Sequence, residues 1–223
     1  MKIISYNINR CTQEKIDALL SRQADLYILP EMAEPRLLSF SDCFEAKWTG
    51  DYPQKGLGVI YKKTLNIDDA PIEVDQNYFI PLIVNDRLIV AAWPTKQGVS
   101  EKLSYPKITM LAFEQLAPLI AKLPTIISGD FNCYKGQSGQ TKNSSIEAID
   151  NFLQQHGLHS LYHRMSGESI GEESICTYHH LFKKEKNMEF FIDYTYTNMK
   201  VADFRIEPWD PNISDHCAQT IVI

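Results

Sequence analysis

Short runs of apolar and β-branched residues recur along the whole chain, with polar residues between them. Several runs are apolar at consecutive positions, which is typical of strands buried on both faces of a sheet. The expected strands cover residues 3–8, 25–29, 57–61, 79–84, 88–93, 125–128, 190–195 and 217–222. Many strands, few helices and long loops predict two packed sheets with helices on the outside. The strand order does not follow from this pattern.

Stretches with the apolar spacing of an amphipathic helix lie between these runs. The first covers residues 14–22. The second covers residues 105–122 and contains Pro118, which should end or kink the helix because it lacks a backbone N–H. The third covers residues 145–156, and Gly157 after it is a favourable helix stop.

The chain has 223 residues and contains no repeat, low-complexity segment or linker that would divide it. We therefore expect one domain over residues 1–223. A chain of this length buries roughly 70% of its unfolded surface, so it needs neither a disulfide nor a metal ion merely to fold.

The cysteine pattern indicates a reducing environment. The chain has 5 cysteines, an odd number, and no CxxC pair, which fits free thiols better than a disulfide framework or a zinc site. A strand-like run begins at Lys2 in place of a signal peptide, and no apolar run approaches the roughly 20 residues that span a membrane. We therefore expect a cytoplasmic protein and, since no protein partner is evident, a monomer.

The net charge is −6, whereas proteins that bind long duplex DNA usually carry a basic excess or patch. The longest basic cluster, Lys183, Lys184 and Lys186, is interrupted by Glu185 and is typical of a solvated loop. The acidic balance argues mildly against tight binding of long duplexes. It does not exclude a short nucleic acid or a small phosphate ester as the substrate. Carboxylates that bind a metal ion would themselves make the net charge more negative.

Polar side chains stand where the expected strands end or are interrupted, the position at which sheet proteins often place their chemistry. Each of them alone is more typical of a solvated loop residue, a cap or a turn. Asp193 is the exception, because an acid within an apolar strand costs several kcal/mol unless it is paired. The set comprises Asn7, Glu31, Asp130, Asn132, Asp193, Asp215 and His216.

Two short segments that contain these residues have side chains suited to binding and cleaving a phosphate ester. In Gly129-Asp130-Phe131-Asn132, glycine permits a sharp turn. Asp130 and Asn132 project to the same side if the segment stays extended, so that a carboxylate and an amide could address an attacking water and a phosphoryl oxygen. In Ser214-Asp215-His216, the carboxylate can hold a hard cation while the imidazole faces a phosphate oxygen.

The motifs Tyr6-Asn7, Pro30-Glu31, Gly129-Asp130-Phe131-Asn132, Ile192-Asp193-Tyr194 and Ser214-Asp215-His216 follow one another along the chain. In this order and spacing they resemble the endonuclease/exonuclease/phosphatase (deoxyribonuclease-I-like) superfamily. That superfamily includes pancreatic deoxyribonuclease, abasic-site endonucleases, neutral sphingomyelinases, inositol polyphosphate phosphatases and deadenylases. The resemblance runs from residue 3 to the C-terminus, and the chain is similar to a compact bacterial branch.

This resemblance implies a four-layer α/β/β/α sandwich in which two mixed, mostly antiparallel sheets pack face to face between outer helices. It implies Mg²⁺-dependent or Mn²⁺-dependent hydrolysis of a phosphodiester by in-line attack of an activated water. The substrate would be a nucleic acid or a small phosphorylated molecule. By the same resemblance, Glu31 would be the main metal ligand, helped by Asn7 and Asp215.

The resemblance also implies catalytic roles for the remaining residues. Asp130 would orient or deprotonate the attacking water, and Asn132 would hold a phosphoryl oxygen. His216 would bind the phosphate and stabilise its developing charge, with Asp193 accepting a hydrogen bond from its ring. Such preorganised groups are each worth on the order of 10²–10³ in rate.

One position departs from the family pattern. Many relatives place a histidine or tyrosine before a proline on the central strand, to act at the leaving group, but this chain has Trp93 before Pro94. An indole N–H donates a hydrogen bond but is not a labile acid. A metal-bound water or Tyr52 could substitute, and Trp93 could either contact the substrate or pack in the core.

Further candidates for the substrate side are Asn9, Lys55 and Thr177, with a structural or solvated role as the alternative for each. The segment Thr177-Tyr178-His179-His180 could face the substrate, since it precedes the expected strand that contains Asp193, with a structural or surface role as the alternative. Its adjacent histidines would point to opposite faces of a strand and are therefore poor joint metal ligands.

Two other functions remain open at this stage. One is a phosphomonoesterase or a phospholipid-headgroup hydrolase, since the fold alone does not decide the substrate. The other is a non-catalytic binding protein on the same scaffold, which would predict a broken set of site residues.

Overall fold

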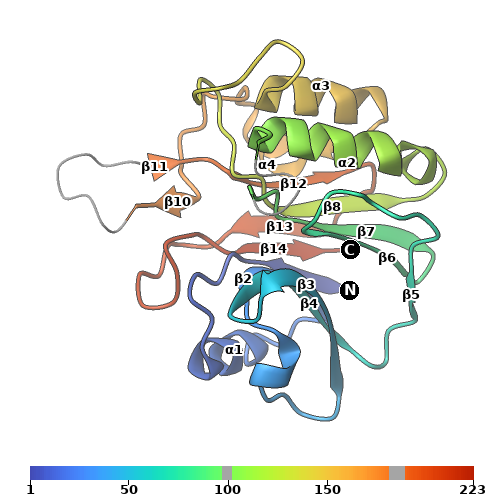
Figure 1. Cartoon of the computed structure of the whole chain (residues 1–223), viewed down its shortest axis with the longest axis vertical. Coiled ribbons are helices and arrows are strands. Elements are labelled where there is room, and N and C mark those ends of the chain that lie inside the picture. Colours follow the sequence, from blue (N-terminus) through green and yellow to red (C-terminus); the bar gives the residue numbers. More distant parts are fainter. Residues whose placement is uncertain (97–101, 181–188) are drawn as a thin grey trace.

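The computed structural model describes residues 1–96, 102–180 and 189–223. Its strands form two six-stranded sheets, which lie in the middle of the molecule with helices on either side (Figure 1). The basic cluster of Lys183, Lys184 and Lys186 lies outside the described residues.

The first sheet has the strand order β13-β14-β1-β2-β4-β3. Within it β1 and β2 run parallel, and the other neighbours run antiparallel. Its strands are β1 (Lys2–Ser5), β2 (Leu26–Met32), β3 (Phe44–Tyr52), β4 (Lys55–Lys62), β13 (Asp203–Ile206) and β14 (Gln219–Val222).

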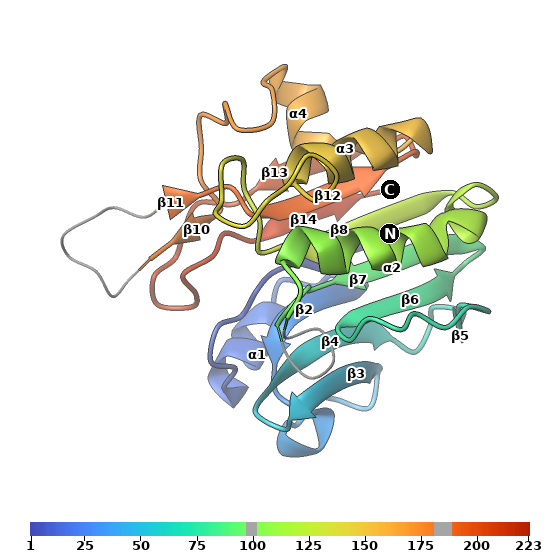
Figure 2. The same ribbon diagram turned by 45° about the horizontal axis from the view of Figure 1, so that its top comes forward.

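The second sheet has the order β5-β6-β7-β8-β12-β9, with β7 and β8 parallel and the other pairs antiparallel. Its strands are β5 (Ile67–Asp69), β6 (Phe79–Val84), β7 (Arg87–Ala92), β8 (Thr125–Asp130), β9 (His159–Ser160) and β12 (Asp193–Thr197). A separate antiparallel arm, β10 (Tyr178–His179) with β11 (Glu189–Phe190), projects beside the loop that leads into β14 (Figures 1 and 2).

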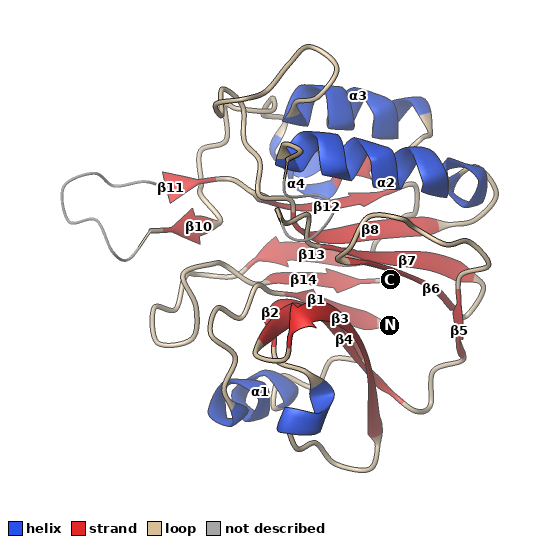
Figure 3. Cartoon of the chain, in the orientation of Figure 1, coloured by secondary structure: helices blue, strands red, loops and turns tan. Residues whose placement is uncertain are grey.

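Helices cover the outer faces of the two sheets (Figure 3). On one side lie α2 (Tyr105–Ile120), α3 (Ile146–Gln155) and α4 (Leu161–Ser166), and on the other lie α1 (Gln13–Leu20) and the 3₁₀ turn η1 (Pro35–Leu37). The expected four-layer sandwich of two mixed, mostly antiparallel sheets is confirmed. Among the described residues, no helix is both long and apolar enough to cross a membrane.

Consecutive side chains of a strand point to opposite faces of the sheet, and both faces are buried, which explains the unbroken apolar runs. In β2, Leu26 and Ile28 pack between the two sheets, whereas Tyr27 and Leu29 pack towards α1. A third core fills the space between the second sheet and the helices α2 and α3. Burial on both faces is therefore the reason that these strands lack polar alternation.

Some expected boundaries require correction. The expected strand 190–195 is two strands, β11 and β12, because the Thr177 hydroxyl accepts hydrogen bonds from the backbone N–H groups of Ile192 and Asp193, each at 3.0 Å, where the chain passes from the arm to the sheet. Helix α2 continues to Ile120, two residues beyond Pro118, because a proline in the last turn removes only one backbone hydrogen bond.

Candidate active site

The polar residues at the strand ends meet at one edge of the two sheets. The carboxyl ends of β1, β2 and β8 lie at the same edge as the amino ends of the antiparallel strands β12 and β14. A cavity of about 340 Å³ opens there. Its walls include Glu31, Asp130, Asn132, Asp215 and His216, so residues from both halves of the chain face one space.

A buried line of carboxylate, imidazole and carboxylate forms the centre of the site. His216 Nδ1 lies 2.9 Å from Asp193 Oδ2, and His216 Nε2 lies 4.0 Å from Asp130 Oδ2. Burial alone would lower the pKa of His216, but Asp193, Asp130 and Asp215 together raise it to about 9. The imidazolium form is therefore favoured at neutral pH.

Asp130 is held in place from two sides. Asn7 Nδ2 donates to Asp130 Oδ2 at 3.0 Å, and the backbone N–H of Asn132 donates to Asp130 Oδ1 at 2.8 Å. Burial raises the pKa of Asp130 to about 7, against the opposing effect of His216. A carboxylate with such a pKa can accept a proton near neutral pH.

Asp130 and Asn132 were expected to project to the same side if the segment after β8 were extended. This segment is not extended. Asn132 has a left-handed backbone with φ of 51°, and its Nδ2 donates to Pro94 O at 3.1 Å. Both side chains nevertheless reach the cavity. The backbone turn, rather than strand alternation, brings them together.

Gly129 is required by the close approach of the neighbouring strand. Its φ is +150°, and a Cβ placed there would lie 1.9 Å from the carbonyl oxygen of Ala92 on β7. Because Asp130 follows directly, any backbone shift at Gly129 would move the Asp130 carboxylate.

We therefore expect Gly129→Ala to lower the free energy of unfolding by about 3–5 kcal/mol, from overpacking plus backbone strain. Gly136→Ala is the matched control, since Gly136 has φ of +83° but nothing within 4 Å of its would-be Cβ. It should cost only about 1–2 kcal/mol. Urea unfolding of both variants measures the difference, and equal losses would contradict the steric argument.

Glu31 owes its position to a bulge in β2. The register between β2 and β4 shifts between Pro30 and Met32, and Glu31 has φ of +64°. Bulges re-aim side chains, and strained backbone of this kind tends to occur at functional sites. Lys55 Nζ lies 3.1 Å from Glu31 Oε1, so this carboxylate already attracts a cationic group.

Glu31 and Asp215 are the residues best suited to hold a divalent cation. Both carboxylates line the cavity, and hard cations prefer oxygen ligands. In contrast, the Asn7 amide oxygen accepts the N–H of Asn9 at 3.0 Å, and the amide nitrogen faces Asp130. The amide nitrogen also lies 3.5 Å from Glu31 Oε1, so Asn7 contacts both carboxylates, and its expected role as a metal ligand stays a prediction.

A second group could also hold an ion on distance alone. One ligand atom each from Asp130, Asp193 and His216 lie within 4.8 Å of one another. However, the Asp193–His216 hydrogen bond would have to break to admit a cation, and the raised pKa of His216 makes its ring a cation itself.

The substrate-side candidates fall into two pairs. Trp93 is only 2% exposed and packs edge-on against Tyr78, with ring centroids 5.1 Å apart, in the core between the sheets. Thr177 is fully buried and holds the backbone at Asp193. These positions support structural roles for both. Asn9 and Lys55 lie beside Asn7 and Glu31 and remain at the surface.

Three tyrosines line the cavity, of which sequence analysis singled out Tyr178, within the segment 177–180, but not Tyr105 or Tyr134. Tyr105 begins α2, and the ring of Tyr178 lies 4.9 Å from the ring of His216. Burial raises the pKa of Tyr178 to about 12, so its hydroxyl stays a neutral hydrogen-bond donor. Tyr52, by comparison, is 62% exposed at the end of β3 and is not among the residues that line the cavity.

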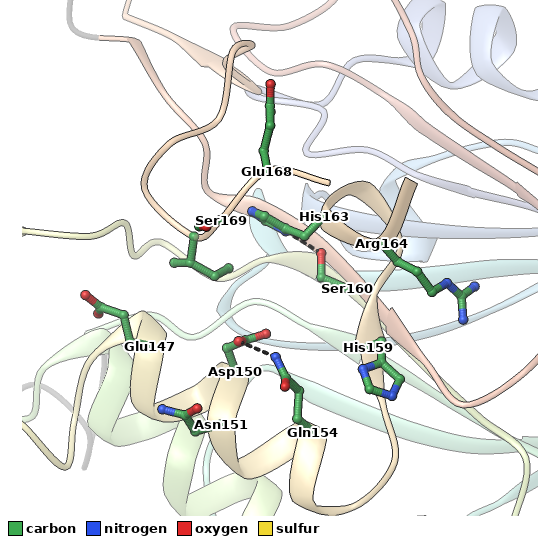
Figure 4. Close-up of a pocket in the computed structure, with 11 residues that line it drawn as sticks. Glu147, Asp150, Asn151, Gln154, His159, Ser160, His163, Arg164, Glu168 and Ser169 are labelled. Carbon is green, nitrogen blue, oxygen red and sulfur yellow. Dashed lines mark hydrogen bonds between the residues drawn. The ribbon is translucent and has the colours of Figure 1, made fainter. Parts of the chain in front are cut away.

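A larger cavity, of about 480 Å³, lies between α3 and α4 and contains none of these residues (Figure 4). Its histidine, His163, is held between Ser160 Oγ at 2.7 Å and Glu173 Oε1 at 3.0 Å. The size of a cavity therefore does not identify the candidate site. We place the site at the smaller cavity because the polar motifs converge there.

Comparison with known proteins supports the fold. No protein-family model matches the sequence, and no curated protein matches it. Among solved structures, the chain is similar to a 3′ phosphatase from Neisseria bound to product DNA hairpin, with 15% identity, coverage of 99% of this chain and 98% of the other, and a TM-score of 0.73. It is also similar to an AP endonuclease from Archaeoglobus fulgidus, with 13% identity, coverage of 100% and 98%, and a TM-score of 0.73. The endonuclease domain of TRAS1, a telomere-specific non-LTR retrotransposon, matches with 15% identity, coverage of 100% and 97%, and a TM-score of 0.67.

Proposed function

We propose that this chain, which has the fold of the endonuclease/exonuclease/phosphatase (deoxyribonuclease-I-like) superfamily, is a metal-dependent phosphoesterase that hydrolyses a phosphodiester bond. The observation that carries the proposal is the meeting of the Asp193–His216–Asp130 line with Glu31 and Asp215 at one cavity. A buried carboxylate with a strongly raised pKa beside a cavity favours an enzyme over a binding protein, because perturbed pKa values concentrate at catalytic sites.

Asp130 is the group that orients the attacking water and accepts its proton. Its pKa of about 7 suits a base that works near neutral pH, and Asn7 and Asn132 fix its two oxygens. Because one hydrogen bond comes from the segment after β1 and the other from the segment after β8, the carboxylate cannot turn away from the cavity without losing one of them.

His216 binds the phosphoryl oxygens as an imidazolium. Asp193 accepts the Nδ1 proton and leaves Nε2 directed towards Asp130 and Asp215. A preorganised positive charge at this place stabilises the negative charge that grows in the transition state. The second hydrogen of the Asn132 amide, beyond the one given to Pro94, is available to another phosphoryl oxygen.

Glu31 and Asp215 would hold the Mg²⁺ or Mn²⁺ ion. When bound, such an ion supplies a Lewis acid for the phosphoryl group and lowers the pKa of a coordinated water. Since Trp93 is buried, the hydroxyls of Tyr105, Tyr134 and Tyr178, which line the same cavity, are the candidate protein donors to the leaving oxygen.

A nucleic acid is the substrate class that we favour, because the compared enzymes include one bound to a DNA hairpin and an AP endonuclease. The net charge of −6 argues for a short or damaged substrate rather than a long duplex. Parallel assays on abasic duplex, 3′-phosphorylated DNA, plasmid, single-stranded RNA, phosphoinositides and sphingomyelin would separate this class from a phosphomonoesterase and from a phospholipid-headgroup hydrolase.

The metal requirement provides a direct test with bis-p-nitrophenyl phosphate. We expect hydrolysis to stop in EDTA and to return with Mg²⁺ or Mn²⁺. In Glu31→Gln, the Mg²⁺ concentration for half-maximal rate should rise at least about tenfold, because one ligand charge is lost. Glu147→Gln is the control, since Glu147 lines the other cavity. Activity that resists EDTA, or the same Mg²⁺ requirement in both variants, would contradict the proposed site.

A further inference from the structure

Two cysteines and a histidine from distant parts of the chain meet at the base of the β10–β11 arm. Cys176 Sγ lies 3.5 Å from His179 Nε2, and Cys217 Sγ lies 3.7 Å from the same nitrogen. Cys217 also approaches the backbone oxygen of Cys176, at 3.8 Å. The three side chains therefore converge on one point although 38 residues separate His179 from Cys217.

These separations match the spacing of ligands around a tetrahedral cation. With Zn–S bonds of about 2.3 Å and Zn–N bonds of about 2.0–2.1 Å, the sulfur and nitrogen ligands of one ion lie about 3.6 Å apart. The observed distances from sulfur to nitrogen are 3.5 and 3.7 Å. The Cys176 side chain would have to turn towards Nε2 on binding, because its sulfur now lies 3.7 Å from Nδ1, almost as close as to Nε2.

The histidine ring is held in the orientation that a metal ligand requires. Glu189 Oε1 lies 3.2 Å from His179 Nδ1, the nitrogen turned away from Cys217. A carboxylate in this place fixes the tautomer that leaves Nε2 free for a metal ion. Trp209 stacks on the ring, with centroids 4.2 Å apart and planes 12° apart, and its own Nε1 donates to Ser214 O at 2.8 Å.

We propose that Cys176, Cys217 and His179 form a binding site for a thiophilic divalent cation, with Zn²⁺ as the best fit. Thiolate and imidazole ligands select zinc over magnesium, whereas the oxygen ligands Glu31 and Asp215 suit magnesium or manganese. Binding would displace the two thiol protons and leave a fourth position for water or an exogenous ligand. This second site is independent of the proposed phosphoesterase activity.

Such an ion would link two segments that carry residues of the proposed active site. The backbone N–H of His179 donates to Asp215 O at 2.7 Å, and the N–H of Cys217 donates to Thr177 O at 2.7 Å. A cation shared by Cys176 and Cys217 would add a bond between these two segments, one of which carries Asp215 and His216 while the other carries Tyr178. The ion would therefore cross-link the β10–β11 arm to the segment that leads into β14.

Cobalt titration of the full chain in a thiol-free reductant tests the proposal. We expect a thiolate-to-cobalt charge-transfer band that saturates at one equivalent and disappears when Zn²⁺ is added. Cys176→Ser and Cys217→Ser should each abolish or greatly weaken the band. His179→Gln, which leaves both thiols in place, should weaken Co²⁺ binding at least about tenfold.

Two controls separate this site from the rest of the molecule. Cys43→Ser should keep the band, because Cys43 is an exposed cysteine outside the cluster. Glu31→Gln should also keep it, so a failed phosphoesterase proposal leaves this result untouched. Absence of a thiolate band, a band unchanged in Cys176→Ser, or recovery of Cys176 and Cys217 as a disulfide under the titration conditions would each overturn the proposal.

Discussion

Replacing Asp130 by asparagine should lower kcat/KM for a phosphodiester by at least about 100-fold. The amide cannot accept the proton of the attacking water, whereas the carboxylate has a pKa raised by burial to about 7 and can. The substitution keeps the shape of the side chain, so a lower kcat/KM would reflect the loss of the proton acceptor. Steady-state kinetics with bis-p-nitrophenyl phosphate at saturating Mg²⁺ measures it.

Stability should change little in Asp130→Asn, because two effects oppose each other. Removing a buried charge favours folding, but the new NH₂ group faces a donor, either Asn7 Nδ2 or the N–H of Asn132. We expect the free energy of unfolding to move by less than about 2 kcal/mol. Asp150→Asn is the matched control, since Asp150 is a partly buried acid on α3 that lines the other cavity. If both variants retained full activity, Asp130 would not be the base.

The second large effect is expected for His216→Gln, which removes the imidazolium opposite Asp130 and Asp215. Losing a preorganised positive charge at the phosphate should lower kcat by about 10²–10³-fold. The variant should also be less stable by about 3–5 kcal/mol, because it leaves Asp193 buried without its ionic partner. Kinetics must therefore be measured at a temperature at which urea unfolding finds the variant folded.

A double variant distinguishes catalysis from positioning in this pair. Asp193 acts through His216, so Asp193→Asn combined with His216→Gln should be no less active than His216→Gln alone. Because the double variant no longer leaves Asp193 as a buried carboxylate without its ionic partner, it should also recover part of the lost stability. Multiplicative losses of activity would mean that Asp193 contributes to the reaction independently of His216.

The layers of the fold were accessible from the sequence because burial imposes composition. Strands packed on both faces must be apolar throughout, and the run over residues 79–84 matches β6 (Phe79–Val84) at both ends. Strands that are partly exposed carry no such signature. This explains why β3 (Phe44–Tyr52), at the edge of its sheet, and the short β13 (Asp203–Ile206) were not expected.

The resemblance identified candidate site residues, but not how each one is held. Glu31 faces the cavity because of a bulge, and Asn132 faces it because of a left-handed backbone, and neither conformation is encoded in strand alternation. Thr177 and Trp93 were candidates for the substrate side, yet both are buried. Side-chain chemistry alone does not distinguish a residue that contacts a substrate from one that supports its neighbour.

By itself, the sequence determined the sandwich of two sheets, the residue types at the strand ends and their resemblance to a known set of catalytic motifs. These are local properties, since apolar runs and short motifs involve residues that are adjacent in the chain. The resemblance implied the pairing of His216 with Asp193, but only the tertiary structure decided the other contacts: His216 with Asp130, Asn7 with Asp130, and Cys176 and Cys217 with His179. Such contacts depend on strand order and register, which arise from packing between segments far apart in the chain.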